Sequence, residues 1–256
     1  MERRSILILG HGSRRPASNA QFEALVALFR ARRPELDVGH AYIELCDPLL
    51  ADGLAALARR SDRVTVLPLF LFAAGHVKGD LPEALEEART AYPRVRFDVA
   101  AELGVDSTMV SIALDRAGAR VPLRSPEAAE TVVLTIGRGS LDSNANGDFY
   151  KLSRMLCEQG GFARPELCFI AVVEPLLPAA LERAALAKPK RLLVLPYFLF
   201  EGLLIEQIRD EVARFAARHP GIDVRLADHL GPDERLCDVL DARLAALDAA
   251  QEARSA

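Results

Sequence analysis

Residues 63–72, Arg63-Val64-Thr65-Val66-Leu67-Pro68-Leu69-Phe70-Leu71-Phe72, return as residues 191–200, Arg191-Leu192-Leu193-Val194-Leu195-Pro196-Tyr197-Phe198-Leu199-Phe200. Each stretch is a run of aliphatic and β-branched residues, which is typical of a strand buried on both faces of a parallel sheet. The two copies are too far apart for a solenoid, whose repeats are roughly 20–50 residues long. The repeat therefore indicates two copies of one globular domain.

Shorter matches recur along the chain at the same spacing, within one residue. They are Gly10-His11-Gly12-Ser13 with Gly137-Arg138-Gly139-Ser140, Asn19 with Asn146, Pro48-Leu49-Leu50 with Pro175-Leu176-Leu177, and Leu103-Gly104 with Leu230-Gly231. A segment with two prolines and several charges, residues 118–130, separates the copies and reads as a linker. We predict an N-terminal domain over residues 1–120 and a C-terminal domain over residues 130–256.

The composition is that of an ordinary globular protein. Of the 256 residues, 50% are hydrophobic and 27% are charged, and the net charge of −4 favours no contact with nucleic acid. The longest apolar run, Val64 to Ala74, is shorter than the ~20 residues that cross a bilayer, so we expect no membrane contact. The four cysteines form no CxxC pair and are expected to be core residues.

The N-terminus lacks a long apolar leader, so we expect a cytoplasmic protein.

Strand and helix patterns alternate within each copy. This alternation predicts an α/β fold with two duplicated doubly wound domains, each a four-stranded parallel sheet flanked by helices. Such sheets bind ligands beyond the carboxyl ends of their strands. The expected strands are residues 5–9, 38–45, 64–72 and 96–101 in the first copy, and 131–136, 167–173, 191–198 and 223–227 in the second; the first copy's helices are 21–32, 48–59, 81–91 and 107–117.

Two Gly-His loops follow strands of the first copy. His11 lies in Gly10-His11-Gly12-Ser13-Arg14-Arg15 after the first strand, and Gly75-His76 follows the third. The first and third strands are neighbours in a doubly wound sheet, so the two imidazoles are expected to converge as metal ligands. A turn histidine at position 11, or two packed histidines meeting by chance, is the alternative. The first loop is neither a dinucleotide fingerprint nor a phosphate loop.

Acidic and basic residues accompany these loops. Glu44 lies inside the otherwise apolar second strand, where an unpaired carboxylate would be costly. We therefore expect it to pair with a structural arginine or to act as a third ligand or proton acceptor. His40 on the same strand is expected to pack. In the second copy Arg138 replaces His11, and Leu203 or Leu204 replaces His76. We expect Arg138, Arg14, Arg15 and Lys78 to hold an anionic ligand across the cleft between the domains, with exposed cations lacking a function as the alternative.

The two Gly-His loops, the Glu44-Leu45 strand end and the Leu67-Pro68-Leu69-Phe70-Leu71 run resemble the sirohydrochlorin chelatases of the CbiX/SirB type. The resemblance covers nearly the whole chain and implies a chelatase-like fold. It also implies ATP-independent insertion of Co²⁺, which the duplicated form favours, or of Fe²⁺, into sirohydrochlorin, in cobalamin or sirohaem biosynthesis. The metal ion is then a substrate, and no organic cofactor is expected.

The resemblance also assigns roles to residues. His11 and His76 bind the metal, and Glu44 assists catalysis. The substrate-binding positions are expected at Gly10, Gly12, Ser13, Arg14, Gly75, Lys78 and Arg138, with Leu69, Phe72, Phe198, Phe200 and Leu203 lining the cleft. We expect a monomer, with a dimer as the alternative. A non-catalytic tetrapyrrole or metal carrier that uses the same histidines is the competing function, and a periplasmic-type binding protein is disfavoured by the missing leader.

Overall fold

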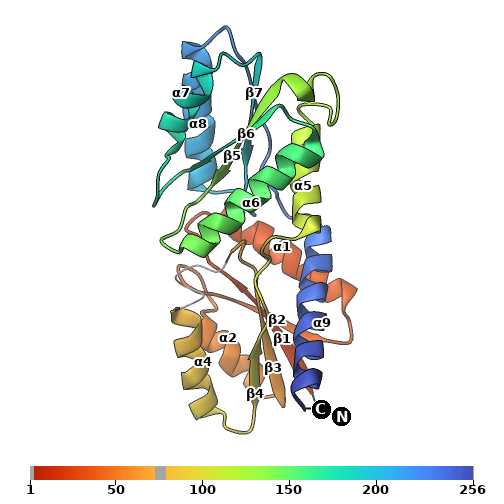
Figure 1. Cartoon of the computed structure of the whole chain (residues 1–256). Helices are drawn as coiled ribbons and strands as arrows, with labels where there is room; N and C mark the ends of the chain where they lie inside the picture. The colour runs from red at the N-terminus through yellow and green to blue at the C-terminus, as the bar shows by residue number, and fades with distance from the viewer. Residues whose placement is uncertain (1–2, 73–78, 256) are drawn as a thin grey trace. The chain divides into compact units, whose positions relative to one another are not determined.

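In the computed structural model, which describes residues 3–72 and 79–255, the chain divides into two compact units. Unit 1 comprises Met1–Asp106 and Pro232–Ala256, and unit 2 comprises Ser107–Gly231. Each unit contains a four-stranded parallel sheet covered by helices on both faces (Figure 1), which confirms the predicted fold class. None of the helices in the described residues is long and apolar enough to cross a membrane.

Unit 1 has the strand order β2-β1-β3-β4. Figure 1 shows α2 and α4 on one face of this sheet and α1 and α9 on the other. The elements are β1 (Arg4–Gly10), α1 (Pro16–Arg32), β2 (Asp37–Tyr42), α2 (Leu50–Ala58), β3 (Arg63–Pro68), α4 (Asp80–Ala91), β4 (Arg96–Val99) and α9 (Arg235–Ser255).

Unit 2 repeats this topology with the strand order β6-β5-β7-β8. Helices α7 and α8 cover one face, and α5 and α6 lie against the other. The elements are α5 (Ser107–Gly118), the 3₁₀ turn η1 (Ala128–Glu130), β5 (Thr131–Gly137), α6 (Ser143–Gly160), β6 (Arg164–Phe169), α7 (Leu177–Leu186), β7 (Arg191–Pro196), α8 (Leu203–Arg218) and β8 (Asp223–Leu226).

Continuous burial of the central strands explains their sequences. In β1, residues 5–10 are all buried, and successive side chains point to opposite faces of the sheet. Leu7 and Leu9 belong to a core with α2 and α4, to which Leu54 and Leu85 contribute. Because both faces carry helices, every position of such a strand favours an apolar residue.

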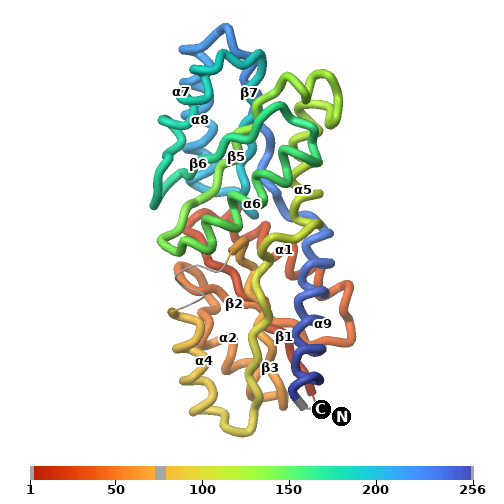
Figure 2. The backbone as a smooth tube through the Cα atoms, in the orientation of Figure 1, coloured from red at the N-terminus to blue at the C-terminus, as the bar shows by residue number. Residues whose placement is uncertain are grey.

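The last helix of each sequence repeat belongs to the other compact unit. Helix α5 follows the first repeat but is part of unit 2, where it packs on α6 and β7. Helix α9 ends the second repeat but is part of unit 1, where it packs on α1 and β3. In Figure 2, α9 lies beside β1, although the two segments are at opposite ends of the sequence. The units therefore differ from the contiguous domains 1–120 and 130–256 predicted from the repeats.

Apart from β1 and β5, which end one residue later than predicted, the predicted strands are longer than the observed ones at their carboxyl ends. Strand β2 ends at Tyr42 rather than at residue 45, because Leu45 adopts a left-handed φ of 69° that a strand does not accommodate. Strand β3 ends at Pro68, and Phe70 continues beyond it as a loop residue that packs against the core. Apolar composition alone does not separate such loop residues from the strand. Conversely, α1 begins before the predicted residue 21, at Pro16, whose ring favours the first helical turn.

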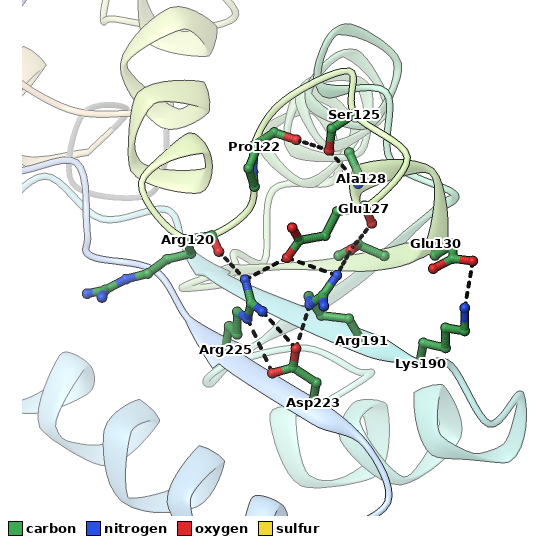
Figure 3. A network of polar contacts seen from close by, with 11 residues as sticks. Arg120, Pro122, Ser125, Glu127, Ala128, Glu130, Lys190, Arg191, Asp223 and Arg225 are labelled. Carbon is green, nitrogen blue, oxygen red and sulfur yellow. Dashed lines mark hydrogen bonds and ion pairs between the residues drawn. The ribbon is translucent and has the colours of Figure 1, made fainter.

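The two charged residues of β4 have exchanged signs in β8 of unit 2, while the arginine at the amino end of β3 is kept in β7. In unit 1, Asp98 of β4 lies 2.7 Å from Arg63 and 3.0 Å from Arg96. In unit 2, Asp223 of β8 lies 2.6 Å from Arg191 and 2.9 Å from Arg225, as Figure 3 shows. Since Arg96 and Asp98 match Asp223 and Arg225 in the repeat, the acid and the base have exchanged places while the network has been retained.

The network of unit 1 includes α9 and predicts a pH-dependent contribution to stability. Asp248 of α9 lies 2.7 Å from Arg4 and 3.1 Å from Arg63. Burial alone would raise the pKa of the Asp248 carboxyl, but the two arginines outweigh burial and hold that pKa below its ordinary value. We expect Asp248→Asn to lower the free energy of unfolding near pH 7 by about 1–2 kcal/mol.

Because the folded pKa of Asp248 is lowered, its contribution is present above the unfolded pKa, about 3.9, and is lost as pH falls through the folded pKa. Urea unfolding at a series of pH values should show the Asp248→Asn difference shrinking below about pH 4. Asp62→Asn is the matched control, because Asp62 pairs with the exposed Arg3 at the protein surface and its loss should cost less than that of Asp248. Equal losses in the two variants would contradict this role of α9.

Candidate functional site

The candidate site lies at the carboxyl edge of the unit 1 sheet, where the strand order reverses. Strand β1 pairs with both β2 and β3, so the loops after these strands begin side by side. This pairing confirms the predicted neighbourhood of the first and third strands. Backbone hydrogen bonds continue past the strand ends: Ile43 N–H donates to Gly10 O and Glu44 N–H to His11 O, at 2.9 and 3.1 Å. The loop that carries His11 is thereby joined to the segment that carries Glu44.

Gly12 allows the closest approach in this loop. Its φ is +91°, and a Cβ placed on it would lie only 1.8 Å from the carbonyl oxygen of Glu44. A side chain is excluded both by the backbone conformation and by the space, so only glycine fits. Gly10 is restricted as well, because a Cβ there would lie 2.8 Å from the ring of Phe22. The two glycines that flank His11 therefore reflect close packing of this loop against Phe22 and the Glu44 backbone.

His11 and Glu44 face one another across these two loops. The His11 Nδ1 atom lies 3.6 Å from Glu44 Oε1, and the side chains are 31% and 46% exposed. No arginine within residues 3–72 and 79–255 pairs with Glu44, so the structural ion pair considered from the sequence is not found there. Because β2 ends at Tyr42, the Glu44 carboxylate is in a loop rather than buried in a strand. Imidazole and carboxylate together can bind a divalent ion or exchange protons with water.

A hydrogen-bonded set behind the loop holds Ser13 in place. Asn19 Nδ2 of α1 donates to Ser13 O at 2.8 Å, and the Cys46 thiol donates to the same oxygen at 3.1 Å. Cys46 is half-buried here, which corrects the expectation that all four cysteines are core residues; Cys157, Cys168 and Cys237 are buried. The role of Asn19 was missed from the sequence, although its match to Asn146 in the repeat is a usable signal.

The structure describes only some of the other predicted site residues. Gly75, His76 and Lys78 lie outside the described residues, so the convergence of the two histidines stays a prediction. Arg14 is exposed and has no ion pair within the described ranges. Nor do the described residues bring three or more His, Cys, Asp or Glu side chains together in a group that could hold a metal ion. Of the predicted reacting groups, the structure brings together His11 and Glu44.

His40 packs, as predicted. Its ring centroid lies 5.9 Å from that of Phe22 and 5.8 Å from that of Tyr42, in edge-on geometry. Burial lowers the pKa of the His40 imidazole, so the ring is neutral near pH 7. Tyr42 in turn donates from its hydroxyl to Glu23 at 2.9 Å. These contacts attach β2 to Phe22 and Glu23 of α1.

Unit 2 reproduces the loop geometry without the chemistry. Gly139 has a φ of +88°, and a Cβ there would lie 2.3 Å from the carbonyl oxygen of Ala171. Asn146 Nδ2 donates to Ser140 O at 2.7 Å, as Asn19 does to Ser13. However, Ala171 takes the place of Glu44, and the exposed Arg138 takes that of His11. The backbone frame is duplicated, whereas the imidazole and carboxylate occur in unit 1.

The apolar residues predicted to line a cleft differ in how far they are exposed. Leu69 is only 3% exposed and offers no free surface in its unit, whereas Phe198 is partly buried against the core of unit 2. Phe72 and Phe200 are half-buried, whereas Leu203 at the start of α8 is 52% exposed. Apolar type alone did not distinguish residues that complete the sheet core from those left at its edge.

Comparison with known proteins identifies relatives along the whole chain. The CbiX family model matches residues 5–119 and 132–247. A sirohydrochlorin cobaltochelatase of Priestia megaterium is 32% identical over 241 residues, which cover 94% of this chain and 78% of the relative. A sirohydrochlorin ferrochelatase of the same organism is 29% identical over 240 residues, with 92% and 87% covered.

Solved structures agree on the fold. SirB from Bacillus subtilis, solved with Fe³⁺, superposes with a TM-score of 0.83 at 24% identity, and the match covers 98% of each chain. The structure of CbiX described as the terminal enzyme of sirohaem biosynthesis in denitrifying bacteria gives a TM-score of 0.65 at 20% identity, with 95% and 99% covered. At these identities the likeness concerns the fold, and it supports the duplicated chelatase-like architecture.

The close approach at Gly12 predicts a large effect of a single methyl group. In Gly12→Ala the Cβ must displace the Glu44 carbonyl and hold a strained φ, so we expect a loss of about 2–4 kcal/mol in the free energy of unfolding. Urea unfolding followed by circular dichroism measures this loss.

Gly147→Ala is the matched control, because a Cβ at Gly147 in α6 would meet nothing within 4 Å. Its stability should be unchanged or raised by up to about 1 kcal/mol, since alanine favours helix. If Gly12→Ala unfolds at the same urea concentration as the wild type, the two loops do not approach as described.

Proposed function

The chain belongs to the CbiX family, and we propose that it is a chelatase that inserts Co²⁺ or Fe²⁺ into sirohydrochlorin without ATP. The observation that carries the proposal is the pairing of His11 with Glu44, 3.6 Å apart, at the ligand-binding edge of a doubly wound sheet. Relatives that match over more than nine-tenths of this chain are a sirohydrochlorin cobaltochelatase and a sirohydrochlorin ferrochelatase. The proposal that no nucleotide is needed rests on the sequence, which contains no phosphate loop.

The reaction requires the donor types that this edge supplies. Insertion of M²⁺ replaces the protons of two pyrrole N–H groups, so two protons leave for each metal ion that enters. We propose that the His11 imidazole binds the incoming ion and that the Glu44 carboxylate assists as a ligand or accepts a proton. With its side chain 46% exposed, Glu44 can pass that proton to solvent. Nitrogen and oxygen donors leave coordination positions open, unlike a closed thiolate site.

The remaining predicted residues are assigned by the same proposal. We place His76, between Gly75 and Lys78 in the sequence, as the second metal-binding imidazole. Gly10, Gly12 and Ser13 form the backbone frame against which the substrate lies. The substrate's side-chain carboxylates need cations in a chain of net charge −4, and Arg14 and Arg138 are exposed guanidinium groups suited to this contact.

We propose Co²⁺ as the preferred ion, which would place the enzyme in cobalamin biosynthesis, and Fe²⁺ with sirohaem biosynthesis as the second choice. Imidazole and carboxylate accept both ions, so the choice is supported by the cobaltochelatase relative at 32% identity and by the duplicated form. We further propose a cytoplasmic monomer, because its four cysteines are free thiols and the repeat supplies two copies of the fold in one chain.

Substitutions at the site test the proposal directly. We expect His11→Ala to lower the rate of metal insertion about 10²–10⁴-fold, and Glu44→Gln to lower it less if Glu44 acts only as a ligand. The measurement is anaerobic: sirohydrochlorin is mixed with Co²⁺ or Fe²⁺ in the absence of ATP, and absorbance is followed above the spontaneous rate. His219→Gln is the control, because His219 pairs with Glu182 at the end of α8 in unit 2.

The competing function is a tetrapyrrole or metal carrier that uses the same residues. A carrier would bind sirohydrochlorin in equal amounts but would not accelerate metallation over the spontaneous rate. Acceleration by the wild type that survives in both variants would instead show that another part of the chain performs the chemistry. A requirement for ATP would contradict the proposal, since the sequence contains no phosphate loop.

A further inference from the structure

A pocket lies in unit 2, at the carboxyl ends of β7 and β8. It is remote in sequence from the His11 loop and uses none of the residues assigned above. Its walls come from α8, from the end of β7, from the segment that follows β8, and from the residue two places after α5. We call it the β8 pocket, and it is lined by Arg120, Pro196, Ile205, Ile208, Arg209, Leu226, Ala227, Asp228 and His229.

His229 is the unusual group in this pocket. Its side chain is 11% exposed, and both ring nitrogens are buried without a hydrogen-bond partner in the described part of the chain. The ring faces the carboxylate of Glu201, whose Oε2 atom lies 3.5 Å from Nδ1. This is an ion-pair contact rather than a hydrogen bond. A buried polar ring without hydrogen-bond partners is rare in native proteins and commonly marks a place where a ligand or an ordered water binds.

Arginines surround this imidazole, and each is already oriented. Arg209 holds Glu201 through both terminal nitrogens, at 2.6 and 3.1 Å. Arg120 reaches both oxygens of Asp228 through Nη2 at 3.3 Å. Its backbone carbonyl accepts a hydrogen bond from Arg225, and Figure 3 shows its guanidinium pointing away from that network. Asp228 is the sole acceptor of the Arg120 side chain among the described residues, so further N–H groups remain for a ligand.

The charges favour an anion over a cation. Both carboxylates near the pocket are held by arginines, so a metal ion would have to displace a guanidinium from each of them. Burial lowers the pKa of the His229 imidazole, and the nearby arginines Arg209 and Arg116 lower it further against the opposite effect of Glu201 and Asp228. The ring is therefore neutral near pH 7 and offers one N–H to an acceptor.

The other wall of the pocket is aliphatic. Ile205 and Ile208 lie on successive turns of α8 and face Leu226 of β8 within the same pocket. Both isoleucines belong to the buried core of unit 2, whereas Leu226 is only partly buried, so this wall presents an apolar surface to the pocket. A ligand that combines a negative group with a short hydrocarbon segment uses both walls.

We propose that the β8 pocket binds the carboxylate of a short aliphatic chain, with His229 and Arg120 donating to the carboxylate oxygens and the wall that includes Leu226 and Ile205 contacting the methylenes. Two sources present this chemistry: a free monocarboxylate, or a carboxylate-bearing side chain of a larger substrate. The second source rests on the proposed function, because sirohydrochlorin carries such side chains.

The test titrates acetate, propionate and butyrate into the full-length protein, with sodium chloride matched for ionic strength. The readout is the ring resonances of His229 in a histidine-labelled sample, assigned with His229→Gln. We expect His229 to respond, with affinity rising about fourfold for each added methylene. Arg120→Gln should weaken binding about tenfold or more, since it removes a charged donor. Arg218→Gln is the matched control, because Arg218 on α8 pairs with Glu182 outside the pocket.

A response of His229 that chloride reproduces, or affinity that does not depend on chain length, would overturn the proposal. The source is then identified with sirohydrochlorin metallation assays. An Arg120→Gln variant with a raised KM and unchanged kcat assigns the pocket to a substrate side chain. Unchanged KM together with propionate binding assigns it to a free monocarboxylate. Because the resonance titration needs no metallation, its outcome is independent of whether the chain is a chelatase.

Discussion

The contact between the bare Cα of Gly12 and the carbonyl of Glu44 is the constraint on which the candidate site depends. It brings the loop after β1 against the segment after β2, and the hydrogen bond from Glu44 N–H to His11 O joins the two. The imidazole and the carboxylate are thereby placed 3.6 Å apart by backbone packing rather than by their own attraction. The backbone therefore preorganises the pair. Both side chains stay partly exposed, so an ion from solvent can reach them.

Unit 2 shows that this constraint is separable from the chemistry. Gly139 and Ala171 repeat the close approach, yet they present neither imidazole nor carboxylate. A fold that positions its loops through backbone contacts leaves the side chains at those positions free to differ. The amino ends of the sheets obey a different rule, because there the charges hold the structure together. Asp98 and Arg225 occupy matched positions with opposite charges, and each retains its ion pairs because its neighbour changed as well.

The sequence was sufficient for the fold class and for half of the candidate site. Strands buried on both faces have continuous apolar sequences, which makes them easy to recognise. The internal repeat presents each such strand in two copies, so each assignment is supported by its match. Strand ends were predicted less well, because Leu45 and Phe70 are apolar residues that pack outside the ladder. His11 and Glu44 could be predicted because both follow strands whose order the α/β rule fixes. His229 could not, because its significance lies in the lack of partners for a buried ring, and partners are a property of tertiary packing.

The exchange of α5 and α9 gives the duplication a physical meaning. Each repeat ends with a helix that belongs to the other unit, so unit 2 is inserted within the chain of unit 1. Two separate copies that exchanged their last helix would show this reciprocal pattern as a domain-swapped dimer, and joining them end to end would retain it in one chain. Helix α9 packs on α1 and β3 and pairs Asp248 with Arg4 and Arg63, so unit 1 is completed only when residues 235–255 have been made. The sheet that carries His11 and Glu44 therefore depends on residues of the second repeat, which explains why a copy without the imidazole and the carboxylate would still be retained.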